Sequence, residues 1–169
     1  MPPPLSEQDY SAIGKAVTAF SQLENLLAQI NALCDVGNDT TVLNEHQTIF
    51  VCHVKKSFRQ RVNALVVNLG QNPNRKLDID TVETSLNTIV KWRDCICHGV
   101  FTKHSGGQLE LVFWDRKSFD EAKEDEKGDI RSGPIQKLLK TADLIAVAKE
   151  AQRLKEILAN EFSMEKFLS

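Results

Sequence analysis

The segment KWRDCICHG, at residues 91–99, brings an arginine, a carboxylate and a histidine close together in sequence. Asp94 and His98 are four residues apart, which places them on the same face of a helix, one turn apart. The carboxylate can then accept a hydrogen bond from the imidazole and fix its tautomer. The helix macrodipole favours a positively charged imidazolium in this last turn. Arg93 adds a permanently charged, forked donor that matches phosphate oxygens. These residue types indicate acid–base chemistry at a phosphate.

Arg93 and His98 are not expected to meet within one straight helix. A separation of five residues leaves them about 140° apart around the helix axis. We therefore expect them to converge only if the helix unwinds at Gly99, or if two copies of the chain share one site across a symmetric interface.

Arg93-Asp94-x-x-x-His98-Gly99 resembles the R-x4–6-H motif of HEPN domains, in which a polar residue often follows the arginine. The motif lies near the end of the third expected helix, as it does in that superfamily. The segment FSQLE, at residues 20–24, is similar to the acidic position of the superfamily's first helix. The likeness follows most of the chain in helix order, and the short motif is its specific part.

The resemblance implies an all-α, usually homodimeric protein that needs no cofactor or metal. In many members the Arg and His of two protomers form a ribonuclease site, where a ribose 2′-hydroxyl attacks the adjacent phosphate and leaves a 2′,3′-cyclic end. His98 would then move the proton, Arg93 would stabilise the phosphorane, and Asp94 would orient or polarise the site. Such proteins often act as toxins or in phage defence, so RNA and an antitoxin or other partner protein are candidate partners. Other members only bind nucleic acid or a partner, which is the alternative function.

Basic residues outside the motif form a second candidate feature. Lys55 and Arg59 are four residues apart and share a helix face, with Lys56 and Arg61 beside them. This strip is either a solvated face or a surface that contacts RNA phosphates without reading sequence. Two lysines near the motif belong to the same expectation. The residues expected to contact substrate are Lys55, Lys56, Arg59, Lys91 and Lys103.

Each candidate also has a plainer interpretation. His98 can simply end a helix, and Arg93-Asp94 can be a structural ion pair. Glu24 is expected at a boundary or interface rather than in catalysis. The aromatic residues near the motif could stack bases or belong to the core; they are Trp92, Phe101 and Trp114.

A metal site is the least favoured interpretation of the cysteines and histidines. Structural zinc sites usually pair cysteines at C-x2–4-C spacing, and Cys95 and Cys97 are closer than that. Buried thiols are expected instead. The ligands that a zinc site would need are Cys52, His53, Cys97 and His98.

Four long segments carry apolar residues at every third or fourth position, which is typical of amphipathic helices. Ser6 and Asp9 have the spacing of a capping box at the start of the first. The β-branched first half of the second predicts a bend or break. In the third, Arg93 occupies a position that the period reserves for an apolar side chain. The expected helices cover residues 6–33, 41–69, 78 or 80 to 99, and 134 or 141 to 162.

The pattern changes before the last helix. VFTKH and QLELVFW alternate apolar and polar residues on either side of a Gly-rich turn. We expect a β-hairpin over about residues 99–115 and an exposed charged loop over about 115–133. Residues 1–169 then form one all-α domain, an up-and-down bundle of about four to five helices with a small β-hairpin before the last helix.

The composition is that of an ordinary folded domain. Of 169 residues, 41% are hydrophobic and 26% charged, which disfavours disorder, collagen and a disulfide-rich miniprotein. There is no apolar run long enough to span a membrane, and the start MPPPLSEQDY lacks the features of a signal peptide. We therefore expect no membrane association and a cytoplasmic location.

Charge is distributed unevenly along the chain. The formal net charge is −2, which by itself argues against a general nucleic-acid-binding surface. Residues 1–50 hold one Lys or Arg against six Asp or Glu, whereas residues 51–104 hold nine against four. Residues 105–169 hold eleven against thirteen. The basic middle third contains the R-x4-H motif, so the net charge does not exclude RNA there.

Overall fold

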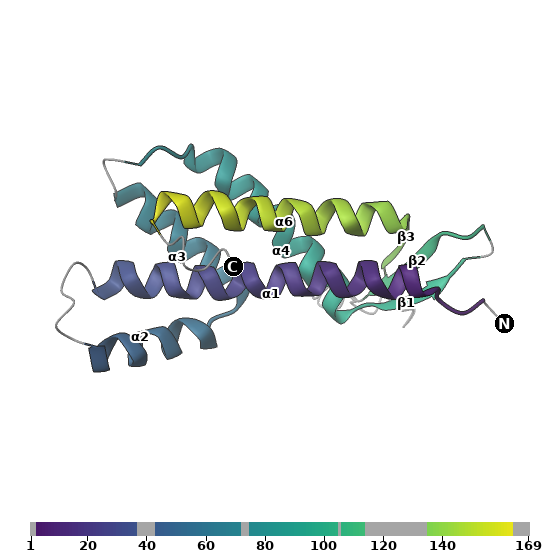
Figure 1. Ribbon diagram of the computed structural model, residues 1–169, viewed down its shortest axis with the longest axis horizontal. Helices are drawn as coiled ribbons and strands as arrows, with labels where there is room; N and C mark the ends of the chain where they lie inside the picture. Colours follow the sequence, from purple (N-terminus) through teal and green to yellow (C-terminus); the bar gives the residue numbers. More distant parts are fainter. Residues whose placement is uncertain (1–2, 37–42, 72–74, 105, 114–134, 164–169) are drawn as a thin grey trace, which may run out of the picture. The chain divides into compact units, whose positions relative to one another are not determined.

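The computed structural model describes residues 3–36, 43–71, 75–104, 106–113 and 135–163. These residues form five helices and three strands, so the chain is mainly helical (Figure 1). The prediction of a mainly helical fold with a small β-hairpin is confirmed, and it is incomplete, because a third strand joins the hairpin. In chain order the elements are α1 (Glu7–Val36), α2 (Leu43–Lys55), α3 (Phe58–Gln71), α4 (Ile79–His98), β1 (Val100–Lys103), β2 (Leu109–Phe113), β3 (Ile135–Leu139) and α6 (Thr141–Glu161).

The chain divides into two compact units. Unit 1 comprises Met1–Val17 and Lys91–Ala148, and holds the start of α1, the end of α4, the sheet and the start of α6. Unit 2 comprises Thr18–Val90 and Lys149–Ser169, and holds the remaining helical residues. The R-x4-H motif belongs to unit 1, and the basic strip of the second predicted helix belongs to unit 2.

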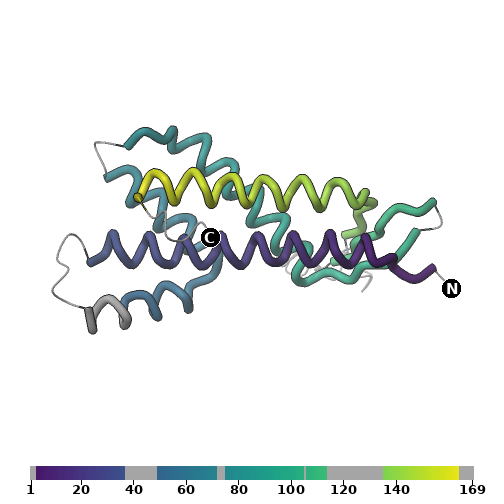
Figure 2. The backbone as a smooth tube through the Cα atoms, in the orientation of Figure 1, coloured from purple at the N-terminus to yellow at the C-terminus, as the bar shows by residue number. Residues whose placement is uncertain are grey.

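Unit 2 has a helical core built from the stripes that the sequence predicts. Large aliphatic side chains recur at helical spacing and are completely or almost completely buried, which removes their surface from water. Figure 2 traces the backbone of the helices that supply them. The core includes Leu23, Leu27 and Ile30 of α1, Leu65 and Leu69 of α3, Leu86 and Ile89 of α4, and Leu154 and Leu158 of α6.

The second predicted helix is broken, as its β-branched first half suggests. α2 ends at Lys55 and α3 begins at Phe58. Ser57 caps the new helix, because its Oγ accepts from the backbone N–H of Gln60 at 3.3 Å and its own N–H donates to Gln60 Oε1 at 2.8 Å. This reciprocal pair is a capping box that satisfies two backbone donors at the break.

Unit 1 contains a three-stranded antiparallel sheet in the order β1-β2-β3. The predicted hairpin is confirmed as β1 and β2, with Gly107 at a φ of 79° in the turn, where glycine has no steric cost. The third strand was not predicted. Residues 135–139 pair with β2 and α6 begins at Thr141, so of the two predicted helix starts Thr141 is confirmed and Pro134 is wrong. The loop expected at 115–133 lies outside the described residues.

The predicted capping box at the start of α1 has a further role. Asp9 is buried, and its carboxylate accepts from the Ser6 N–H at 2.9 Å and from the Ser6 hydroxyl at 2.6 Å. It also pairs with Lys103 Nζ at 2.6 Å and accepts from the Thr141 hydroxyl at 2.9 Å. The Lys103 ammonium and the Ser6 donors hold the pKa of Asp9 far below its usual range. Lys103, one of the residues expected to contact substrate, joins β1 to α1 through this buried carboxylate.

This ion pair makes the stability of the protein depend on pH. Because the folded pKa of Asp9 is depressed, its contribution is complete above about pH 5 and is lost progressively toward pH 2. We expect Asp9→Asn to cost on the order of 3 kcal/mol at pH 7 by leaving Lys103 unpaired. The difference from wild type should shrink between pH 5 and pH 2, as measured by urea unfolding. Asp80→Asn, at an exposed site, is the control; a difference that stays constant with pH would contradict the assignment.

The four cysteines are thiols, but they are less buried than predicted. Cys95 is buried, whereas Cys34, Cys52 and Cys97 are exposed. Cys97 directly follows the buried Ile96, and a step of one residue turns the side chain about 100° away from the core. The prediction of buried thiols was therefore wrong for three of the four.

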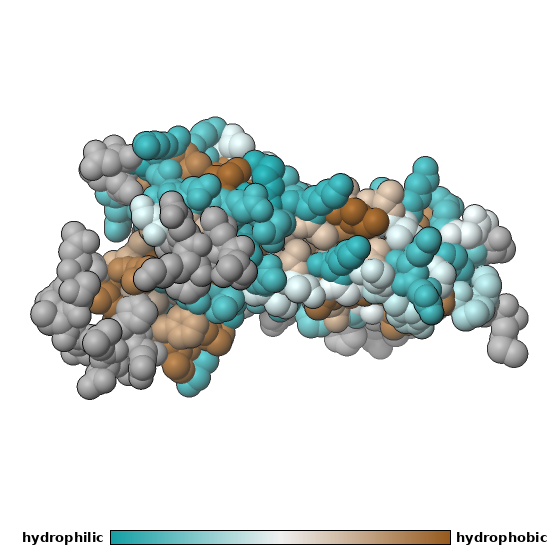
Figure 3. All heavy atoms as spheres, viewed as in Figure 1, coloured by the Kyte–Doolittle hydropathy of each residue, from teal (hydrophilic) through white to brown (hydrophobic). Residues whose placement is uncertain are grey.

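The described surface is largely polar, with apolar side chains reaching it in places (Figure 3). Val51, Val54 and Val67 are exposed apolar residues of unit 2, and Val100 and Leu138 are their counterparts in unit 1. No helix among the described residues combines the length and the apolar character that crossing a membrane requires.

Candidate active site

The candidate site lies where α4 meets the sheet. His98 is the last residue of α4, and β1 begins at Val100, so Gly99 alone connects them. A Cβ atom on Gly99 would lie 2.5 Å from the carbonyl oxygen of Cys95 and closer still to the side chain of Leu111 in β2. Glycine is required here because the end of the helix packs directly against the sheet.

Arg93 and His98 meet within a single chain. Arg93 Nη1 lies 3.5 Å from His98 Nε2 and 3.1 Å from Asp94 Oδ1. The expectation that one straight helix would keep them apart was wrong, since α4 remains helical through His98. Five residues rise only about 7.5 Å along the axis. The long arginine side chain spans that distance, although the Cα–Cβ bonds of Arg93 and His98 point in different directions around the helix.

Asp94 holds the arginine rather than the histidine. In the part of the chain that the structure describes, no hydrogen bond joins Asp94 to His98, contrary to the expected carboxylate–imidazole pair. Arginine has only donors, so Nε2 is the acceptor in its contact with His98, which leaves the proton of a neutral ring on Nδ1. This contact takes up the Nε2 lone pair, so Nε2 can accept a proton from a substrate once the guanidinium turns to a phosphate instead.

The three motif side chains are open to large ligands. The Arg93 side chain is 27% exposed and that of Asp94 is 49% exposed, and His98 is also exposed. Lys91, one of the predicted substrate contacts, is exposed on the same final stretch of α4. A polymer that lies along the surface could therefore reach these groups without entering a cavity.

Lys137 is a residue of this region that sequence reasoning missed. Its Nζ lies 5.5 Å from the centroid of the Trp92 ring and 5.7 Å from that of Phe113. Both distances are in the range of cation–π attraction. Residues 135–139 read apolar, polar, polar, apolar, apolar, which is not the alternation of a strand, and Pro134 favours the start of a helix.

The predicted basic strip is only partly on the surface. Lys55 and Arg59 are exposed, as expected, and Lys56 is half-buried with Nζ 3.3 Å from His53 Nδ1. His53 is itself buried, and its Nε2 lies 2.6 Å from Asp35 Oδ2. These strip residues belong to unit 2, whereas the motif belongs to unit 1.

Arg61, the fourth member of the strip, is a core residue, and the surface role considered for it was wrong. Its guanidinium donates to the carbonyl oxygens of His53 at 3.0 Å, Val54 at 2.5 Å and Glu24 at 3.1 Å. It also pairs with Glu24 Oε2 at 3.2 Å. Glu24 is thus a half-buried partner that joins α1 to α3, in keeping with the boundary position expected for it.

The aromatic and metal-ligating candidates remain to be placed in the structure. Trp92 and Phe101 are half-buried, and Trp114 lies outside the described residues. Among the residues with described positions, no group of three or more His, Cys, Asp or Glu side chains could hold a metal ion. The zinc site considered for Cys52, His53, Cys97 and His98 therefore has no structural support.

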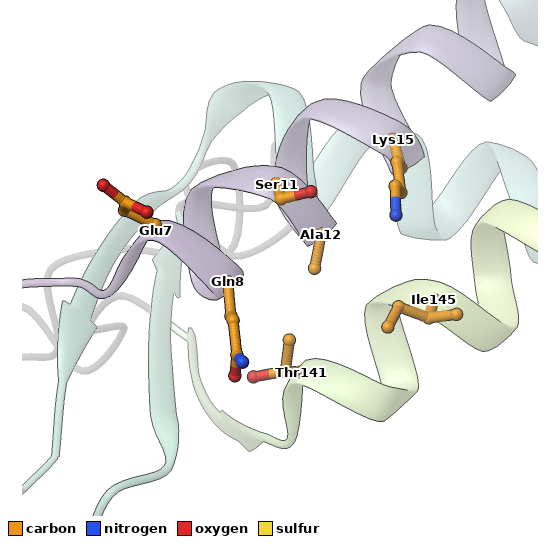
Figure 4. Close-up of a pocket in the computed structure, with 7 residues that line it drawn as sticks. All are labelled: Glu7, Gln8, Ser11, Ala12, Lys15, Thr141 and Ile145. Atoms are coloured by element: carbon orange, nitrogen blue, oxygen red, sulfur yellow. The ribbon is translucent and has the colours of Figure 1, made fainter.

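A pocket of about 380 Å³ lies in unit 1 between the beginnings of α1 and α6 (Figure 4). Gln8 and Thr141 point toward one another across it, and Lys15 and Ile145 line its other end. Its volume falls in the range of small-molecule sites. The motif residues are not part of its lining, which consists of Glu7, Gln8, Ser11, Ala12, Lys15, Thr141 and Ile145.

No protein-family model, curated protein or solved structure matches this chain. The candidate site therefore has to be judged on its own geometry. That geometry combines a guanidinium, an imidazole and a supporting carboxylate on one exposed helix end. Such a set can bind a phosphate and move a proton beside it.

The close approach at Gly99 gives a prediction for this region. We expect Gly99→Ala to destabilise the protein by about 1–3 kcal/mol, because the new methyl group collides with the Cys95 carbonyl and Leu111. Chemical denaturation measures this cost. Gly14→Ala is a matched control in α1, where nothing lies within 4 Å of the added carbon, and it should stabilise the helix slightly. Equal effects of the two substitutions would contradict the packing described here.

Proposed function

We propose that this protein is a metal-independent endoribonuclease of the HEPN type. The observation that carries the proposal is the contact of Arg93 Nη1 with both Asp94 Oδ1 and His98 Nε2. It places a fixed positive charge beside a proton acceptor on an exposed helix end. RNA supplies a matching substrate, since each internal phosphate is anionic and has a ribose 2′-hydroxyl next to it.

The proposed reaction is an internal transesterification. The Arg93 guanidinium turns from His98 Nε2 to the phosphate, so that Nε2 can remove the proton from the 2′-hydroxyl. The 2′-oxygen then attacks the adjacent phosphorus. The guanidinium of Arg93 stabilises the negative charge that builds up on the phosphorane, with Asp94 holding it in place. The bond to the 5′-oxygen then breaks, and that oxygen takes a proton from an acid. The products are a 2′,3′-cyclic phosphate and a 5′-hydroxyl end.

A dimer would supply the second proton-transfer group. In a symmetric pair, His98 of one protomer serves as the base and that of its partner as the acid, which is the composite site of the proposal. The finer features of the HEPN type belong to the same proposal: an up-and-down helical bundle, a cytoplasmic location, and a toxin or defence role with an antitoxin or other protein partner.

The proposal is tested by incubating the purified protein with RNA in the presence of EDTA. We expect cleavage that the chelator does not prevent, with 2′,3′-cyclic phosphate ends identified by mass spectrometry. Analytical ultracentrifugation of the same sample should show a dimer. Intact RNA under every buffer condition tried would end the nuclease proposal.

Nucleic-acid binding without cleavage is the second candidate function. It is favoured by the position of Lys91 and Lys137, which are exposed cations outside the Arg93–His98 contact. A protein that retains RNA in a filter-binding assay and leaves it uncut would have this function.

A further inference from the structure

Lys137 is linked to the end of α4 by contacts with β2, the middle strand of the sheet. Lys137 in β3 is the register partner of Leu111 in β2. Leu111 is also the side chain that packs most closely on Gly99, directly after His98. The ammonium of Lys137 lies over Trp92, which directly precedes Arg93. All of these residues belong to unit 1.

The two aromatic rings restrict where the Lys137 ammonium can be. Its Nζ is 5.5 Å from the Trp92 centroid and 5.7 Å from the Phe113 centroid, so it is held between α4 and β2. A flexible lysine side chain loses rotamer entropy when it binds a ligand. Attraction to the two rings favours this position of the ammonium, so the lysine loses less entropy when a ligand binds it there.

The charge of Lys137 is also available. The residue is exposed, and among the residues that the structure describes no carboxylate lies within ion-pair distance of it. Lys103 on the same sheet is different, because its ammonium is bound to the buried Asp9 at 2.6 Å. Cation–π contacts neutralise no charge, so Lys137 can still attract an anion from the solvent side.

We infer that Lys137 is a substrate-positioning residue that binds a backbone phosphate of RNA where the sheet meets α4. The identity of the reaction rests on the proposed function, whereas the phosphate contact can be measured without any cleavage. Lysine reads charge and not base identity, so the contact strengthens binding equally for all sequences. It corresponds to one of the ion pairs formed with the RNA strand.

The test uses a fluorescent single-stranded RNA in which every 2′-hydroxyl is methylated, so that no nucleophile is present. Anisotropy titrations over a range of salt give the dissociation constant and its salt dependence. We expect Lys137→Gln to weaken binding roughly three- to tenfold and to reduce the slope of log K against log salt by about 0.7. Oligouridine and oligoadenine should be affected equally. Lys137→Arg, which keeps the charge, should restore most of the binding.

Lys149→Gln is the matched control, since Lys149 is an exposed lysine of α6. The inference is overturned if Lys137→Gln binds as tightly as wild type with the same salt slope, if Lys149→Gln causes the same loss, or if wild type does not bind the oligonucleotide. Cleavage of unmodified RNA separates this result from the proposed function. If binding depends on Lys137 but RNA is not cleaved, the proposed nuclease activity is rejected and the phosphate contact of Lys137 is supported. If RNA is cleaved and Lys137→Gln leaves KM unchanged, the nuclease activity is supported and the phosphate contact is rejected.

Discussion

Substitution of His98 by alanine is expected to lower the rate of RNA cleavage by about 10²–10⁴-fold, the usual contribution of a general acid–base group. The Nε2 atom that contacts Arg93 Nη1 at 3.5 Å is the proton acceptor of the proposed reaction, and alanine has no replacement for it. The loss should appear in kcat, because the imidazole acts on the 2′-hydroxyl in the transition state rather than on the bound phosphate. His98 is exposed, so its removal should leave the free energy of unfolding nearly unchanged.

His104→Ala is the appropriate control for this experiment. His104 is also exposed and follows β1, where its Nδ1 accepts from the Gly106 N–H at 3.3 Å. It should cleave RNA at nearly the wild-type rate. Gel-based initial rates with both variants, at RNA concentrations above and below KM, separate kcat from binding. Undiminished cleavage by His98→Ala would reject His98 as the proton-transfer group.

Substitution of Arg61 by alanine is expected to destabilise the protein by about 3–5 kcal/mol, a large part of the stability of an ordinary domain. The guanidinium donates to three backbone carbonyls and to the Glu24 carboxylate, in a place where only 10% of its side chain is exposed. Without it, the Glu24 carboxylate loses the guanidinium, and the carbonyl oxygens of His53 and Val54 lose a donor. Unfolding in urea, followed by circular dichroism, measures the change.

Arg59→Ala tests whether the effect is specific to the buried arginine. Arg59 lies two residues away on the same helix and is exposed, so its loss should change stability by less than about 0.5 kcal/mol. Arg61→Lys keeps the charge but not the fork, so it should recover only part of the stability. Similar unfolding midpoints for the Arg59 and Arg61 alanine variants would contradict the internal role of Arg61.

Features that depend on neighbouring residues could be predicted from the sequence. The three- and four-residue spacing of Leu23, Leu27 and Ile30 indicates the buried side of α1, and these side chains are fully buried. The Ser6–Asp9 capping box and the hairpin around the Gly-rich turn are local patterns as well, and both are present. The position of the R-x4-H motif at the end of a helix is confirmed, while its chemistry stays a prediction.

Features that depend on distant partners could not be predicted. β3 owes its conformation to pairing with β2, and its five residues contain no period that outweighs a helix start at Pro134. Arg61 and Glu24 are 37 residues apart, and Lys103 and Asp9 are 94 apart. Nothing in the sequence around a charged residue indicates such a distant partner, so Arg61 and Lys103 were both expected on the surface.

The Arg93–His98 contact was missed for a different reason. Angles around an ideal helix describe where the backbone directs each Cβ, and they leave out the length of the side chain. Arginine is long enough to lie along the helix and reach a residue five positions ahead, as it does here. Side-chain reach therefore has to be considered together with angular separation when a motif contains arginine or lysine.

The single-residue connection between α4 and β1 also limits how the length of this chain can vary. One residue added at Gly99 would shift β1 by one position, and each of its side chains would then face the opposite side of the sheet. Lys103 would lose its ion pair with Asp9, and the Val100 side chain would lie on the opposite face of the sheet. Insertions and deletions should therefore be excluded between residues 98 and 103, where spacing is as constrained as residue identity.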